Sequence, residues 1–277
     1  MNKKERLLQE SVAGLFALLC ILFFQFFDPD RLFLKEQMVS ITSLPEVLSG
    51  YWGKPAWLAC SLARTLTSLH VPVGGGAVLI ALVLLAEWWA SLFILKKFHV
   101  GGMAPLYALF PVILEWGTYC SHYYHLNSIL SLILTLYIFC GYTLIKTKWL
   151  SWVAGFALLF VVYSLVGSRL FIFVILVLLY EAEIGEKHWV YWALLLITGI
   201  LLPEFLKELY SLSEEDAYQY PHAWLPAFFP AIVLACVLVA TQFEKVRHMK
   251  ISILSVSITT GLLLVLLLVA ISGYAIG

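Results

Sequence analysis

Charge is scarce in this sequence. Asp, Glu, Lys and Arg together make up 12% of its 277 residues, whereas soluble domains carry about 25%. The 17 basic and 17 acidic side chains cancel, so we expect no nucleic-acid partner. Too few polar side chains are present to cover a globule of this size. These shortages exclude a soluble enzyme and a disordered chain.

Cysteine is also scarce, with five residues in the chain, which excludes a secreted disulfide scaffold. Three of them, Cys20, Cys140 and Cys236, fall in apolar runs and are interpreted as small apolar side chains. Cys60 and Cys120 fall outside those runs, and their spacing alone does not establish a pair. No repeat or low-complexity segment is present, so a solenoid is excluded.

Long apolar runs dominate what remains, because 62% of the residues are hydrophobic and the mean hydropathy is +0.93. A membrane-spanning helix needs about 20 mostly apolar residues. The sequence therefore predicts an all-α, polytopic transmembrane helix bundle, a single integral membrane domain over residues 1–277. Its nine expected spans are 11–27, 76–95, 103–119, 126–145, 149–166, 170–180, 189–206, 223–241 and 251–275.

The positions of Lys and Arg predict how these spans are oriented. Lys3, Lys4 and Arg6 precede the first span, and most other basic residues follow on the same side if the N-terminus is cytoplasmic. No small-residue cleavage site follows Phe27, so the first span is interpreted as a retained anchor. Nine spans then leave the C-terminus outside, and the expected location is the bacterial inner (cytoplasmic) membrane.

Two segments are expected to form the main extracytoplasmic loops. In the first, residues 28–75, Leu58, Leu62, Leu66 and Leu69 recur at helical spacing, which predicts an amphipathic surface helix. The second, residues 203–222, is acidic and rich in tyrosine. An ordinary solvated loop and a sugar- or cation-binding loop both fit that composition.

Three acids are the candidate catalytic residues. Asp28 and Asp30 flank a proline where the first span ends. Such a pair can hold a divalent cation or supply a general base, and it can equally be a solvated helix end. Glu115 is expected near the outer boundary of the membrane, within reach of the extracytoplasmic vestibule that Asp28 and Asp30 would line.

Gly74, Gly75, Gly76 and Arg169 are the candidate substrate-binding residues. The three glycines precede the second span, where free amides at a helix N-terminus can hold the phosphate of a lipid-linked substrate; a flexible joint explains them equally well. Arg169, at the outer end of the sixth span, is a candidate anion partner. No metal site is assigned, because Cys120, His122 and His125 provide fewer than four ligands.

Glu87 is expected deep in the bilayer, where an ionisable group invites a functional hypothesis. A proton relay and a hydrogen bond to a neighbouring helix are the two alternatives. The second is favoured, because no chain of polar partners accompanies Glu87.

Several segments resemble an uncharacterised family of bacterial polytopic inner-membrane proteins. The resemblance rests on Gln9-Glu10-Ser11, the aromatic run 23–27, Lys35-Glu36-Gln37, residues 54–59, Gly74-Gly75-Gly76 and Glu87-Trp88-Trp89, and is strongest over residues 8–90. It implies a membrane bundle without an assigned activity. Family members continue into an extracytoplasmic helical region, so the resemblance implies that this chain is the membrane half.

The layout is also similar to C-type glycosyltransferases, which use lipid-linked sugars. In those enzymes an acid in the outer loop after the first span activates the acceptor, often beside a divalent metal. Asp28 or Asp30 holds the matching place here. The likeness is one of layout alone.

Three functions follow from these observations. The first is an extracytoplasmic transferase acting on a lipid-linked substrate, in which Asp28, Asp30 and Glu115 converge in one cavity. The second is a non-enzymatic scaffold or envelope component, with dispersed acids. A transporter ranks last, because polar residues along several spans are missing. Membrane lipids are the expected partners in all three.

Overall fold

The computed structural model describes residues 3–27, 50–67, 74–121, 124–185, 188–221 and 228–275. These residues form helices and turns, with no strand among them, which confirms the all-α prediction. Contacts divide the chain into two compact units. Unit 1 comprises Met1–Ile41, Arg64–Leu126 and Pro226–Gly277, and unit 2 comprises Thr42–Ala63 and Asn127–Leu225.

Helices of membrane-spanning length occur in both units. In the part of the chain that the structure describes, five stretches are long and apolar enough: Lys3–Phe27, Gly75–Lys97, Lys148–Ile184, Trp189–Tyr210 and Ile253–Ser272. Two further apolar helices, Leu126–Tyr142 and Phe229–Ala240, are shorter. The expected number of nine spans is therefore not confirmed, although a helix lies within each of the nine expected runs.

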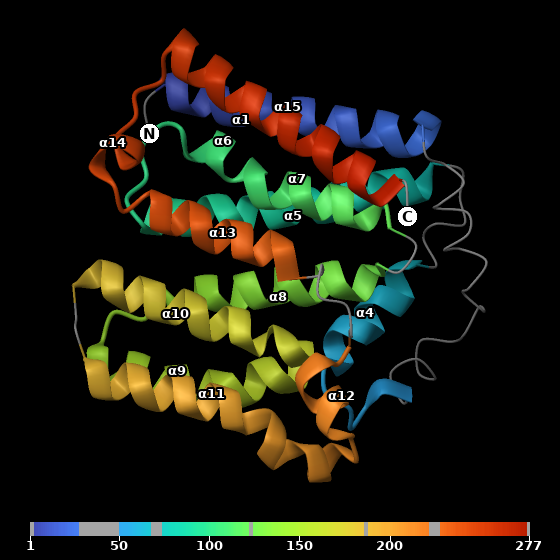
Figure 1. Ribbon diagram of the computed structural model, residues 1–277, viewed down its shortest axis with the longest axis vertical. Coiled ribbons are helices and arrows are strands. Elements are labelled where there is room, and N and C mark those ends of the chain that lie inside the picture. Colours follow the sequence, from blue (N-terminus) through green and yellow to red (C-terminus); the bar gives the residue numbers. More distant parts are fainter. Residues whose placement is uncertain are drawn as a thin grey trace. The chain divides into compact units, whose positions relative to one another are not determined.

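Unit 1 is a bundle in which α1, α5, α7, α13 and α15 run side by side (Figure 1). Its elements are α1 (Lys3–Leu22), the π-helical η1 (Phe23–Phe27), α5 (Gly75–Lys97), α6 (Ala104–Tyr107), α7 (Leu109–Tyr119), α13 (Phe229–Ala240), α14 (Glu244–Arg247) and α15 (Ile253–Ala275). Helix α7 is central, since it packs against α5, α13 and α15.

Basic segments that are far apart in the sequence meet at one end of unit 1, which we call the basic end. Lys96 Nζ, in the last turn of α5, donates a hydrogen bond to Gln9 Oε1 of α1 at 3.0 Å. The backbone N–H of Gly101 donates to the carbonyl of Arg247 at 2.9 Å. The start of α1 and α14 lie at this same end (Figure 1).

Unit 2 is built from α8 (Leu126–Tyr142), α9 (Lys148–Val166), the 3₁₀ turn η3 (Gly167–Arg169), α10 (Leu170–Ile184), α11 (Trp189–Tyr210) and α12 (Glu214–Gln219), together with the first part of α4 (Trp57–Thr67). Helix α9 packs against α10 and α11. It ends at Gly167, whose φ of 71° lies in the region that glycine adopts readily.

Two segments that were expected to be extracytoplasmic loops differ from their predicted structures. Residues 203–222 were expected to be a loop, but α11 continues through Pro203 to Tyr210 and α12 follows. Ser213 caps α12 by accepting a hydrogen bond from the N–H of Asp216. The amphipathic helix predicted in the first loop is present as α4. However, its buried residues are small ones, Ala59, Cys60, Ser61 and Ala63, rather than the leucines.

Candidate functional site

The predicted acids Asp28 and Asp30 lie outside the described residues. The first described range ends at Phe27, the residue before Asp28. The π-helical turn η1 that precedes them packs against α7. Phe24 contacts the rings of Trp116 and Tyr119, with centroid distances of 6.1 and 5.8 Å. Short π-helical segments occur frequently at functional sites.

Glu115 precedes Trp116 on α7 and is fully buried, with 0% of its surface exposed. The hydroxyl of Tyr124 donates a hydrogen bond to its Oε1 atom. A buried carboxyl group is costly unless it is hydrogen-bonded, and the tyrosine supplies such a bond. Glu115 therefore lies close to the end of α7, as expected, but it is not exposed to an open vestibule.

Gly74 to Gly76 begin α5 in the same unit. Gly74 is the N-cap residue, with a left-handed φ of 79°, a conformation that favours glycine. A Cβ atom added to Gly74 would lie 3.1 Å from the amide oxygen of Gln25, in η1. The start of α5 thus approaches η1 at Gln25, two residues before η1 ends at Phe27. The η1 segment therefore contacts both the glycines and α7.

Arg169 belongs to unit 2, where it ends the η3 turn and is 1% exposed. The turn is held by α12 and the residue after it: the N–H of Ser168 donates to the carbonyl of Tyr220 at 2.9 Å, and Tyr163 Oη donates to the carbonyl of Ala217 at 2.9 Å. Glu115 and the three glycines belong to unit 1, whereas Arg169 belongs to unit 2.

A further buried carboxyl group, that of Glu181 in unit 2, was not predicted. Tyr142 Oη donates to Glu181 Oε1 at 2.8 Å, and it lies 3.4 Å from Tyr191 Oη. Tyr191 is stacked on Trp152 with a centroid distance of 5.6 Å. The signal was weak in the sequence, because Glu181 looked like the charged end of a short span.

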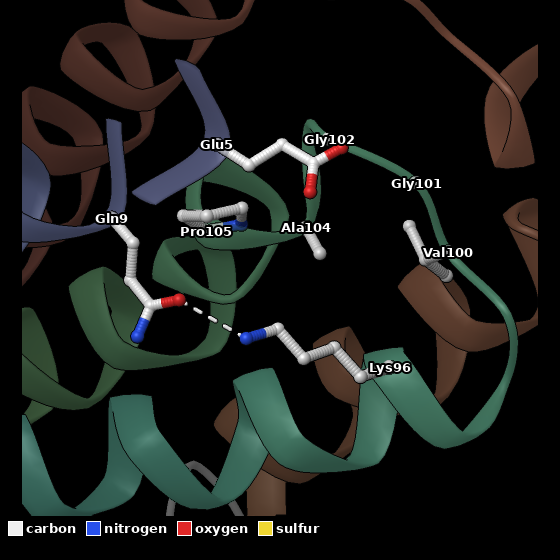
Figure 2. Close-up of a pocket in the computed structure, with 8 residues that line it drawn as sticks. All are labelled: Glu5, Gln9, Lys96, Val100, Gly101, Gly102, Ala104 and Pro105. Carbon is white, nitrogen blue, oxygen red and sulfur yellow. Dashed lines mark hydrogen bonds between the residues drawn. The ribbon is translucent and has the colours of Figure 1, made fainter. Parts of the chain in front are cut away.

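A polar cavity of about 270 Å³ at the basic end of unit 1 was also missed. Figure 2 shows Gln9 and Lys96 on one side and the Glu5 carboxylate beside Gly102 on the other. The cavity forms only when α1, the end of α5 and the turn before α6 come together. In the sequence these residues resemble ordinary polar flanks of two spans.

A larger cavity of about 500 Å³ lies between α6, the start of α7 and α15. Most of its lining is apolar, including Phe110, Ile258 and Leu262, while Lys250, Ser252 and Ser255 contribute polar atoms. Within the described part of the chain, no group of three His, Cys, Asp or Glu side chains is placed to hold a metal ion. Among the described residues no disulfide bond is formed, and Cys60 and Cys120 are therefore not paired with each other.

These features define a class: an all-helical protein whose apolar helices are compatible with a membrane location. The chain belongs to a family of unknown function (DUF6057), which matches residues 4–274. The expected membership of an uncharacterised family is thus confirmed, and the match covers nearly the whole chain. Comparisons with curated proteins and with solved structures gave no match.

Proposed function

We propose that this protein is a multi-pass integral protein of the bacterial cytoplasmic membrane, forming one integral domain with its N-terminus in the cytoplasm and its C-terminus outside. The exposed apolar surface supports this proposal most strongly, because a water-soluble monomer rarely exposes large apolar patches. Helix α15 alone exposes Ile253, Leu254, Ile258, Leu262, Leu264, Val265, Leu268 and Val269.

The orientation is supported by the basic end of unit 1. Segments carrying Lys3, Lys4, Arg6, Lys96 and Arg247 are joined there by the Lys96–Gln9 and Gly101–Arg247 hydrogen bonds. Basic residues are retained on the cytoplasmic side of a membrane protein. The basic segments of unit 1 gather at one end, as expected if its helices alternate in direction across the bilayer and that end is cytoplasmic.

At the opposite, extracytoplasmic end of unit 1 the protein carries a transferase-type site for a lipid-linked substrate. One observation carries this proposal: η1, which leads to Asp28 and Asp30, contacts both α7 beside Glu115 and the Gly74 N-cap of α5. The two aspartates would serve as general acid and base or hold a divalent cation. The glycines at the start of α5 would bind the phosphate of the substrate.

A non-enzymatic scaffold or envelope component is the second candidate. The hydrogen bond from Tyr124 to the fully buried Glu115 favours it, because such a carboxyl group serves the stability of the bundle. On this view the outer helices provide contact surfaces, and Asp28 and Asp30 are solvated.

Substitution of the aspartates separates the two candidates. In cells that express Asp28→Asn or Asp30→Asn at the normal level, we expect the profile of envelope glycans and lipid-linked intermediates to change. Glu215→Gln, a change of an exposed acid on α12, is the matched control and should leave the profile unaltered. Unchanged profiles in both aspartate variants would overturn the transferase proposal and support the scaffold.

A further inference from the structure

The polar cavity at the basic end of unit 1 has the composition of a small-ligand site. Its volume of about 270 Å³ lies just below the range of roughly 300–1,000 Å³ that holds drug-sized ligands. Its polar side chains come from two separate helices, Glu5 and Gln9 from α1 and Lys96 from α5. It therefore suits a ligand of headgroup size with more than one polar group.

One side of the cavity is suited to an anion. The ammonium group of Lys96 has three N–H donors, and its hydrogen bond to Gln9 Oε1 at 3.0 Å uses one of them. Gln9 is 9% exposed, so this bond holds the ammonium in place. The remaining Lys96 donors and the Gln9 amide group can bind phosphate oxygens, and bonds to a charged group are the stronger ones.

The other side is suited to a cation. Figure 2 shows the Glu5 carboxylate beside Gly102 and across the cavity from Lys96. A Cβ atom on Gly102 would lie 2.8 Å from Ile251 and 3.4 Å from Glu5 Cγ. The absence of a side chain on Gly102 therefore lets the backbone fit between these two residues and keeps the stem of Glu5 at the cavity wall.

We propose that this cavity binds a zwitterion that carries a phosphate group and a primary ammonium group, such as the headgroup of an ethanolamine phospholipid. The phosphate binds Lys96 and Gln9, and the ammonium group binds Glu5. Lys96 is in the last turn of one helix of membrane-spanning length, and Glu5 is near the start of another. Because headgroups lie at such helix ends only if these helices span the bilayer, the lipid source depends on the membrane part of the proposed function.

The binding experiment uses the purified full-length protein in an uncharged detergent. Short-chain phosphatidylethanolamine, phosphatidylcholine and phosphatidylglycerol are titrated separately, and bound lipid is measured by native mass spectrometry. Soluble glycerophosphoethanolamine forms a fourth titration and distinguishes a free compound from a lipid. We expect ethanolamine phospholipid to bind at least fivefold more tightly than the choline lipid, whose quaternary ammonium group cannot donate a hydrogen bond to Glu5.

Two pairs of variants test the two sides of the cavity. Lys96→Gln should weaken ethanolamine-lipid binding about tenfold, as expected for the loss of a hydrogen bond from a charged group. Lys97→Gln is its control, because Lys97 Nζ lies over the Phe93 ring, 5.4 Å from its centroid, and Lys97 does not line the cavity. Glu5→Gln should remove the preference for ethanolamine over choline, whereas Glu10→Gln, at the partner of Arg6, should retain it.

The outcomes bear on the ligand rather than on the transferase site. Equal binding of the three lipids, or equal losses in Lys96→Gln and Lys97→Gln, would overturn the proposal, provided that all variants elute as folded protein. Saturable binding of the soluble compound, sensitive to both Lys96→Gln and Glu5→Gln, would identify a free phosphoamine as the ligand. Neither result depends on Asp28 or Asp30, so failure here is distinct from failure of the transferase proposal.

Discussion

Buried carboxyl groups show how single residues are accommodated in this protein. Glu115 in unit 1 and Glu181 in unit 2 are 0% and 6% exposed. Each accepts a hydrogen bond from a tyrosine hydroxyl, Tyr124 and Tyr142 respectively. Placing an ionisable side chain in an apolar bundle is costly, and a tyrosine reduces that cost because it combines an apolar ring with one polar atom.

Tyr142→Phe tests this role at Glu181. The change deletes the hydroxyl that donates to the carboxyl group, so the free energy of unfolding should fall by about 1–3 kcal/mol. Thermal unfolding in detergent measures the effect, and Tyr137→Phe, on the exposed part of the same helix, provides the control. In a double-mutant cycle Glu181→Gln should show coupling with Tyr142→Phe, and additive effects would contradict the role assigned to the hydrogen bond.

The Cys60 thiol provides a prediction about pH. Burial raises the pKa of Cys60, while the hydrogen bonds from Asn127 and Tyr220 oppose the shift. A raised folded-state pKa means that the fold favours the neutral thiol, so its contribution to stability is complete below the unfolded pKa of about 8.5 and is lost as pH rises through the folded value. The loss of stability between pH 7 and pH 10 should therefore be smaller in Cys60→Ala than in the parent protein or in Cys236→Ala, whose cysteine is exposed.

For single residues of the candidate site, the sequence predicted position along a helix but not burial or hydrogen-bond partners. Glu115 was placed correctly near the end of a helix, because apolar runs and boundary tyrosines define helix ends. Its burial and its bond to Tyr124 depend on how the chain turns after Tyr119. Likewise, the cavity of Glu5, Gln9 and Lys96 depends on contacts between residues that are 87 or more positions apart, which no local pattern reveals.

Close contacts between helices depend on small residues at defined positions. A Cβ atom on Gly117 of α7 would lie 2.3 Å from Ala270 Cβ of α15 and 3.1 Å from the Ala270 backbone. Neither neighbour is the end of a flexible side chain, so the two helices would have to separate. Small residues allow this approach between membrane helices in general.

Gly117→Ala is therefore expected to reduce the free energy of unfolding by about 1–3 kcal/mol, the usual cost of overfilling a well-packed contact. Gly261→Ala, on α15 but with no atom within 4 Å of the added Cβ, should be neutral or slightly stabilising. Thermal unfolding compares the two variants. Ala270→Gly should recover part of the loss in Gly117→Ala, and no recovery would mean that the clash lies elsewhere.

Helices were predicted more reliably than their lengths. Each apolar run contains a helix because hydrophobic content over ten or more residues is a strong signal. The run 103–119 is divided into α6 and α7 around Ala108, because Pro111 has no N–H to donate to the carbonyl of Tyr107 four residues earlier. Conversely, the outer loop was predicted to begin at Pro203, but Pro203 lies buried inside α11, which continues to Tyr210. Contacts within the bundle override such local preferences.

At the scale of the whole molecule, the decisive question is which helix ends share a side of the membrane. The basic segments of unit 1 are joined by hydrogen bonds at one end. In unit 2 the turn that carries Lys146 and Lys148 follows Tyr142, near the start of α9. If both groups of basic residues are retained in the cytoplasm, the acidic segment of α12 must face the exterior.

Single cysteines can test this arrangement in intact cells. Thr147, in the turn before α9, and Gln242, between α13 and α14, are both exposed, as is Ser213 at the start of α12. With a membrane-impermeant maleimide we expect labelling of Ser213→Cys but not of Thr147→Cys or Gln242→Cys, and the parent protein controls for the natural cysteines. Opening the cells should make the latter two reactive. Labelling of Thr147→Cys from outside would show that unit 2 has the opposite orientation. Lys146 and Lys148, which flank Thr147, would then lie on the side of the membrane where basic residues are normally scarce.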